Sequence, residues 1–104
     1  MHKVEYIALT FKFSREGNRW NAFCEELGTA TFGRSIPEAE KILREAVLLH
    51  LNTLEEVGER ERFFKEHNIQ LHYIKPKDIT VRLPVEPRVF IQSHIQRIPQ
   101  LCAA

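Results

Sequence analysis

The stretch that decides the fold covers residues 19–46 and reads RWNAFCEELGTATFGRSIPEAEKILREA. Residues 19–25 alternate between two sets of side chains with period two, which predicts a strand. Leu27-Gly28 interrupts the run, and residues 29–32 are β-branched and aromatic, which predicts a short further strand ended by Gly33. The segments before and after these two predicted strands extend the unit that they form.

A capped helix follows the second of these strands. Ser35 and Glu38 have the spacing of a capping box, and Pro37 falls in the first turn, where no intrahelical donor is lost. Three-four spacing predicts a helix through about Val57, with Gly58 as its left-handed stop. The expected buried stripe consists of Ala39, Ile42, Leu43, Ala46, Val47, His50, Leu51, Leu54 and Val57.

The segment before residue 19 predicts the first strand of an antiparallel meander. Residues 3–13 alternate, with Ile7, Leu9, Phe11 and Phe13 on one face. Residues 14–18 contain a Gly-Asn pair that suits a hairpin. We expect the long helix to cover the phenylalanine face of a three-stranded meander.

The segment after the long helix continues with shorter elements. Residues 59–67 predict a short second helix, and residues 69–74 a fourth strand. From Asp78 the chain is apolar and interrupted by Pro84 and Pro87, which suits an edge strand or an arm on a neighbour. The predicted fold is therefore α+β, in the order β-β-β-α-α-β. Its predicted domains are an α+β domain over residues 1–76 and an extended C-terminal arm over residues 77–104, docked on the domain or on a partner subunit.

Composition excludes several classes of protein. The 104 residues carry a net charge of +1, which argues against a strongly basic nucleic-acid binder. Two cysteines without CxxC spacing suit a reducing compartment. The N-terminus lacks the apolar run of a signal peptide, and no run is long enough for a membrane helix. We expect a cytoplasmic protein that is not bound to a membrane.

The central stretch resembles the HicB-like antitoxin family, over about residues 3–75. The residues that carry the resemblance are Trp20-x-Ala22-x-Cys24-x-Glu26-Leu27-Gly28-x-x-Thr31-x-Gly33-x-Ser35-x-x-Glu38-Ala39, followed by Ala46. The chain departs from the family pattern in two places. Gly28-Thr29-Ala30 stands where Pro-Gly-Cys is frequent, and no DNA-binding module follows residue 78.

The resemblance implies a compact α+β domain, similar to a partial RNase H or double-stranded-RNA-binding fold, that self-associates. In the paired systems, members bind and block a small mRNA-cleaving toxin, HicA, whereas many single-domain members have no assigned partner. The resemblance is therefore compatible with a HicA-like toxin or with another partner. Members that repress their own operon carry a DNA-binding module, so the resemblance does not extend to operator binding.

The histidine, glutamate and cysteine residues that could suggest metal binding or catalysis are interpreted as structural or surface residues. His67 and His72 lack the tight ligand pairs of zinc sites, and we interpret them as surface histidines. Glu25 and Glu26 are successive strand residues and point to opposite faces. Cys24 has no histidine near it in sequence and is expected to be a core thiol. An RNase-H-like nuclease would need several converging acids; those in or beside the sheet are Glu5, Glu25 and Glu38. We therefore predict no catalytic, cofactor-binding or metal-ligating residues and no cofactor.

The open face of the sheet is the expected contact surface. Trp20 and Phe23 lie on opposite faces, so one of them leaves the helix-covered side. Together with Tyr6 and Ala8 it would leave apolar surface bare, which a monomer rarely does. We expect a homo-oligomer, a dimer or higher, or contact with a HicA-like toxin through the sheet or the arm. The sequence does not identify the partner-binding residues.

Two other function classes remain. RNA binding would use the basic residues, set against a solvated basic surface as the simpler interpretation. The candidates are Arg15, Arg19, Arg34, Lys75, Lys77, Arg82 and Arg88. The nuclease is the third alternative.

Overall fold

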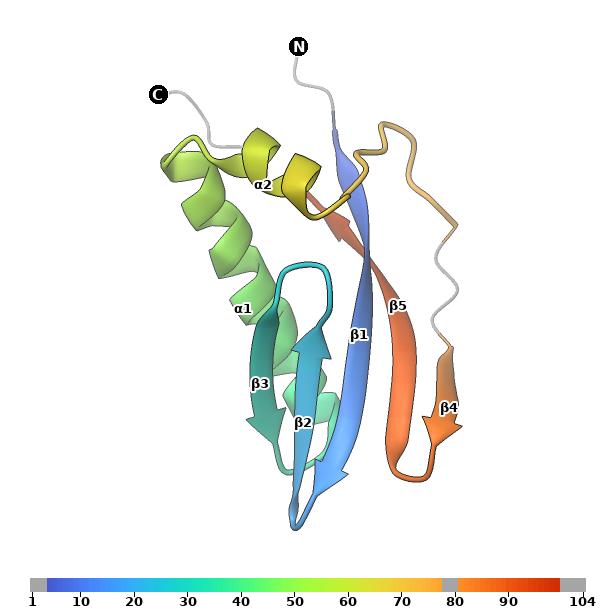
Figure 1. Ribbon diagram of the computed structural model, residues 1–104. Coiled ribbons are helices and arrows are strands. Elements are labelled where there is room, and N and C mark those ends of the chain that lie inside the picture. The colour runs from blue at the N-terminus through green and yellow to red at the C-terminus, as the bar shows by residue number, and fades with distance from the viewer. Residues whose placement is uncertain (1–3, 78–80, 100–104) are drawn as a thin grey trace.

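The computed structural model describes residues 4–77 and 81–99, and within them one five-stranded sheet packs on a long helix (Figure 1). The elements in chain order are β1 (Tyr6–Glu16), β2 (Arg19–Cys24), β3 (Thr29–Gly33), α1 (Ile36–Glu56), α2 (Arg60–Glu66), β4 (Arg82–Glu86) and β5 (Val89–Arg97). The predicted α+β class and the initial three-stranded meander are confirmed.

The sheet has the order β3-β2-β1-β5-β4, and every neighbouring pair is antiparallel. β1 is its central strand, with β2 on one side and β5 on the other. β5 pairs along most of β1, from Tyr6 opposite Arg97 to Ser14 opposite Val89. The segment expected as an extended arm therefore supplies two strands that complete the sheet of the same chain, and β4 forms its outer edge.

The fourth strand expected over residues 69–74 is reduced to one isolated bridge. His72 and Tyr6 exchange two backbone hydrogen bonds of 2.8 Å, and no further ladder forms there. Ile69 is buried, whereas Tyr73 and Ile74 are exposed. The bridge lies on the β2 side of β1, because Tyr6 directs its amide and carbonyl to His72, whereas the neighbouring Glu5 carbonyl accepts from the Ile98 amide on the β5 side. Pro76 follows shortly after and has no amide hydrogen to extend the pairing.

The N-terminus of α1 forms as the sequence predicts, with one difference. Ser35 Oγ accepts a hydrogen bond from the Glu38 amide at 3.2 Å. The Glu38 carboxylate accepts from the Arg34 amide at 3.4 Å rather than from that of Ser35. β3 leads directly into this turn, and Gly33 allows a close approach, because a Cβ there would lie 2.7 Å from the Ala39 backbone nitrogen.

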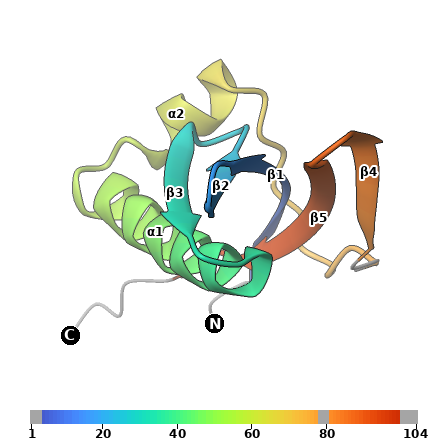
Figure 2. The same ribbon diagram turned by 90° about the horizontal axis from the view of Figure 1, so that it is seen from below.

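The core lies between α1 and one face of the curved sheet (Figure 2). Its buried hydrophobic residues are Ile7, Leu9, Phe11, Phe13, Ala22, Cys24, Leu27, Ala39, Leu43, Val47, Leu51, Leu54, Phe64, Ile69 and Ile98. Each fully buried phenylalanine or leucine contributes about 1.5–3 kcal/mol. Two members of the predicted stripe, Ile42 and Val57, are instead 37% and 61% exposed, since the stripe is narrower than the spacing suggested.

A polar network joins the C-terminal hairpin to α1. The carboxylate of Glu40 accepts hydrogen bonds from Arg82 Nη2 at 2.7 Å and from Gln92 Nε2 at 2.8 Å. Arg82 Nε donates to Gln92 Oε1 at 2.8 Å, which closes the ring. Gln92 is only 2% exposed, so this network satisfies polar groups that would otherwise be costly to bury. The network fastens β4 and β5 to the helix.

Candidate protein interface on the open face of the sheet

The face of the sheet opposite α1 carries a row of residues that runs straight across all five strands. In the pairing register, Phe23 stands opposite Lys12 and also opposite Ala30. Lys12 stands opposite Ile91, and Ile91 opposite Leu83. Because directly opposed residues share a face, these five side chains form one line, which we call the transverse row.

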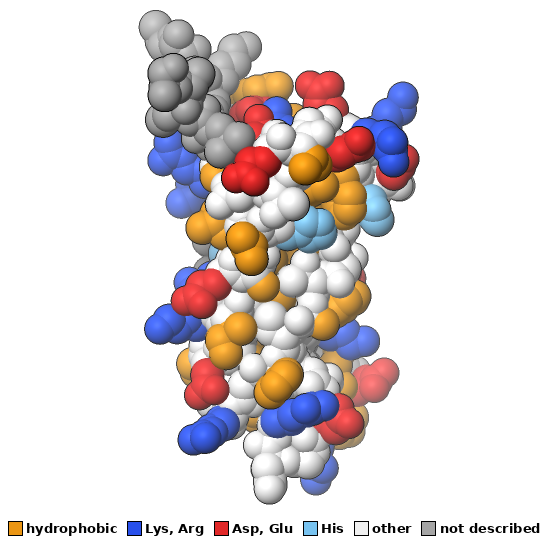
Figure 3. Space-filling view, turned by 90° about the vertical axis from the view of Figure 1, so that its left-hand side faces the viewer, with side chains coloured by type: hydrophobic (Ala, Val, Ile, Leu, Met, Phe, Trp, Pro, Cys, Tyr) orange, Lys and Arg blue, Asp and Glu red, His pale blue; other side chains and the backbone are white. Residues whose placement is uncertain are grey.

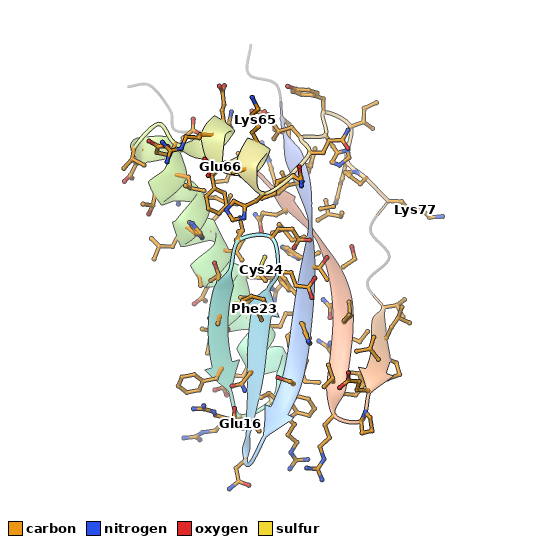
Figure 4. All side chains as sticks on the ribbon, in the orientation of Figure 1. Glu16, Phe23, Cys24, Lys65, Glu66 and Lys77 are labelled. Atoms are coloured by element: carbon orange, nitrogen blue, oxygen red, sulfur yellow. The ribbon has the colours of Figure 1, made fainter. Side chains whose placement is uncertain are left out.

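The transverse row is apolar except at Lys12 and is open to solvent. Phe23 is 38% and Leu83 59% exposed, Ala30 is exposed and Ile91 is half-buried. Figure 4 marks Phe23 on β2, between β3 and β1. The row therefore presents an exposed aromatic side chain on β2, next to the central Lys12, with aliphatic side chains on β3, β5 and β4.

The same face extends beyond the transverse row towards the far end of β1. Ala8 stands opposite Ile95, and the pair adds exposed and half-buried aliphatic surface. Between this pair and the transverse row, Thr10 binds Glu26: the Thr10 amide and Oγ1 donate to the carboxylate at 2.7 and 2.8 Å. This polar contact fixes the β2–β3 loop against β1 beside the apolar surface.

The structure settles which aromatic of β2 faces outward. Trp20 lies on the helix side, half-buried against the core, with its ring centroid 6.0 Å from that of Phe90. Phe23 takes the open face. Sequence reasoning had placed Tyr6 and Ala8 beside this aromatic but missed Ile91, Ile95 and Leu83. The alternation of residues 89–95 was the available signal, but it could not say which strand β5 would pair with.

The acidic residues considered for catalysis lie in separate places. Glu5 accepts from Arg60 Nη1 at 3.4 Å, Glu38 caps α1, and Glu25 is exposed beside the β2–β3 loop. Within residues 4–77 and 81–99, no group of three His, Cys, Asp or Glu residues could hold a metal ion. The positions of these acidic residues therefore give no support to the nuclease alternative.

The histidines are likewise dispersed over different contacts. His50 Nδ1 lies 3.2 Å from Thr29 Oγ1, and His67 stacks on Phe63 with 4.1 Å between ring centroids. His94 stacks on Phe11 at 4.6 Å, while His72 takes part in the backbone bridge to β1. Each of these four histidines thus has a packing or hydrogen-bonding role.

Cys24 is a core thiol. It is fully buried, and burial raises the pKa of the Cys24 thiol to about 11 because the thiolate would lose its hydration. A thiol with that pKa is protonated at neutral pH and is a poor nucleophile. The adjacent Phe23, on the other face of the same strand, is the residue of this pair that solvent reaches (Figure 4).

The basic residues considered for RNA binding divide into three groups. Lys75 and Lys77 are exposed on the segment between the His72 bridge and β4 (Figure 4). Arg82 is bound to Glu40 and Gln92. Arg15, Arg19, Arg34 and Arg88 gather at one end of the sheet, where β1 and β3 end and β2 and β5 begin. There the Arg15 amide donates to the Arg88 carbonyl at 3.0 Å, and the Glu16 carboxylate lies 3.8 Å from Arg19.

The comparisons with known proteins leave the family open. No family model matches the chain, and comparison with the curated proteins and with the solved structures gave no significant match. In the part of the chain that the structure describes, neither helix has the length and apolar character needed to cross a bilayer.

Proposed function

We propose that this chain is a non-enzymatic, cytoplasmic interaction module of the HicB-like antitoxin type, which works by protein–protein contact. The observation that carries the proposal is the transverse row of Ala30, Phe23, Lys12, Ile91 and Leu83 on the uncovered face of the sheet. The sequence resemblance supports a small HicA-like, mRNA-cleaving toxin as the partner.

The physical argument is that this face combines the two features of a binding hot spot. It has an exposed aromatic side chain, Phe23, beside the central strand, and aliphatic side chains on the other strands that share its face. It is also rigid, because the strands beneath it are tied to α1 by the buried core and by the Glu40 network. A rigid surface loses little conformational entropy on binding.

Self-association uses the same surface in this proposal. A homodimer would bury the row of one copy against that of another, and a toxin would compete with it. The two partners are therefore mutually exclusive, and raising the concentration of one should displace the other.

The experiment is toxin neutralisation combined with direct binding. A HicA-like toxin is co-expressed with the wild type, Phe23→Asp or Lys65→Asp, and growth and complex formation are measured. Lys65 is an exposed residue of α2 and serves as the matched control (Figure 4). We expect rescue and binding with the wild type and Lys65→Asp, and loss of both with Phe23→Asp. Neutralisation that survives Phe23→Asp would contradict the proposed surface.

RNA binding is the second candidate, and the cluster of arginines at the end of the sheet favours it. Phosphate contacts make such binding weaken steeply as salt is raised. Titration of double-stranded RNA at two salt concentrations, with Arg15→Glu and Arg88→Glu variants, tests it. Salt-dependent binding that both substitutions weaken supports this candidate, and no shift at low salt contradicts it.

A further inference from the structure

The outer edge of β3 is an unprotected strand edge. Its residues, Thr29–Gly33, contain no proline and no charged side chain, and their register with β2 is unbroken. Among residues 4–77 and 81–99, the backbone hydrogen bonds of β3 run to β2, and none crosses to another segment on the outer side. Natural sheets normally blunt such edges, because an open edge pairs with other chains.

A groove of about 570 Å³ runs along this edge. It is lined by Arg19, Ala30, Thr31, Phe32, Gly33, Arg34, Glu38 and Ile42. Successive residues of a strand point to opposite faces. A groove that touches four successive residues of β3 therefore follows the edge of the strand rather than either face, between the strand and the first turns of α1.

The walls of the groove are apolar and its end is basic. Phe32 and Ile42 are 60% and 37% exposed, and they form its apolar part. The guanidinium of Arg19 lies 4.8 Å above the ring of Phe32, and its Nη2 lies 3.8 Å from the exposed Glu16 carboxylate, which a partner carboxylate would replace. The guanidinium of Arg34 has no ion pair among the described residues, and the Glu38 carboxylate is engaged with the Arg34 amide. Figure 3, seen from the side of α1 and β3, shows hydrophobic side chains on this face among side chains of both charges.

We infer that the edge of β3 receives an extended, acidic segment of a partner protein as an added sixth strand. Its backbone would pair with β3, one apolar side chain would lie between Phe32 and Ile42, and a carboxylate would meet Arg19 and Arg34. Strand addition gives affinity through main-chain hydrogen bonds, and side-chain pockets give the specificity. This surface is separate from the transverse row, except at Ala30, and does not depend on the proposed function.

Charge decides between a peptide and a second copy of this chain. Residues 29–33 of a second copy include no acidic residue, so its strand would bring no carboxylate to either arginine. An arginine that pairs with a carboxylate gains charge-assisted hydrogen bonds. The groove therefore fits an acidic strand better than it fits another β3.

The experiment selects a phage-displayed peptide library on the full chain and measures the selected peptides by fluorescence anisotropy. Ile42→Ser and Arg34→Glu alter the groove. Leu48→Ser and Lys65→Glu are matched controls, since Leu48 is 41% exposed on the same helix but away from the groove. Circular dichroism checks that each variant is folded, and amide hydrogen exchange locates the bound peptide.

The proposal expects enriched peptides with an acidic residue beside β-branched or aromatic residues. It expects each groove variant to weaken binding about tenfold or more, the controls to leave it unchanged, and residues 29–33 to exchange more slowly. Three results would overturn it: no enrichment, peptides whose binding leaves exchange at β3 unchanged, or self-association that Ile42→Ser abolishes. Because Phe23→Asp lies outside the groove, its effect on toxin binding is measured independently.

Discussion

The two edges of the sheet are built differently. At β4, Pro84 has no amide hydrogen to offer a further strand, and the register shifts between Pro84 and Glu86. Arg82 of the same strand is tied back to Glu40 of α1. At β3 there is no proline, no irregularity and no charge, and Gly33 lets the strand approach α1 closely. One edge thus has features that prevent growth of the sheet, and the other has none.

This difference gives the molecule a direction for assembly. A partner strand can add beside β3 but not beside β4, so edge-to-edge growth stops after one addition. The open face between the two edges is a second surface with different chemistry, aliphatic and aromatic rather than hydrogen-bonding.

The largest expected effect follows from Gly33→Ala. The new Cβ would lie 2.7 Å from the Ala39 backbone nitrogen, so β3 and α1 must separate. We expect the free energy of unfolding to fall by about 3 kcal/mol, at the upper end for overpacking. Urea denaturation measures it, with Ala30→Ser as a control on the same strand. A loss below that of the control would mean that the close approach of β3 to the helix is not tight.

The next largest effect on stability is expected at the β4 edge of the sheet. Glu40→Ala leaves the buried Gln92 and the partly exposed Arg82 without their carboxylate. We expect a loss of about 2 kcal/mol, from the cost of an unsatisfied buried polar group. Glu45→Ala, an exposed position on the same helix, should be nearly neutral. Faster amide exchange confined to β4 and β5 in Glu40→Ala would locate the damage, and equal losses in both variants would contradict the role of the network.

A pH titration tests the packing of the β3 side, because Cys24 pairs with Thr29 of β3. Burial raises the pKa of the Cys24 thiol to about 11, so the folded state holds this proton more tightly than the unfolded chain. Its contribution is therefore fully present below about pH 9 and is lost as the pH rises towards 11. In a Cys102→Ala background, the free energy of unfolding should decline over this interval, and Cys24→Val should remove that component. An identical pH profile for the two proteins would contradict it.

The smallest effect on stability is expected for Pro84→Thr. It restores an amide hydrogen on an exposed edge, so the free energy of unfolding should change by about 0.5 kcal/mol or less. Self-association should nevertheless increase, because the β4 edge becomes able to pair. Light scattering over a concentration series measures this, with Val81→Thr as a control outside the strand. If Pro84→Thr stays at the wild-type level, proline is not what closes this edge.

The local elements of the first half were predictable because their signals are short-range. The capping box at Ser35 and Glu38, the glycine before it and the alternation of β1 and β2 all act within a few residues. They were enough to give the α+β class and the helix-covered phenylalanine face. Period two also predicted that either Trp20 or Phe23 faces outward, and the structure places Phe23 there.

The second half depends on long-range pairing, which the local pattern does not determine. Residues 69–74 and 89–97 both alternate, but only the later segment pairs along most of β1, whereas the earlier one meets β1 at a single bridge. The Glu40 network joins residues far apart in sequence and leaves no local pattern. The groove at β3 depends on which strand lies at the sheet edge, and therefore on the placement of every other strand.

Sedimentation velocity is the most direct test that the chain acts by contact through its open face. The wild type and Phe23→Asp are compared at micromolar concentration, each alone and with a HicA-like toxin protein. The account predicts that the wild type sediments as a homodimer or as a complex with that protein, and that Phe23→Asp sediments as a monomer in both samples. A wild type that stays monomeric in both, or a Phe23→Asp variant that still associates, would contradict it.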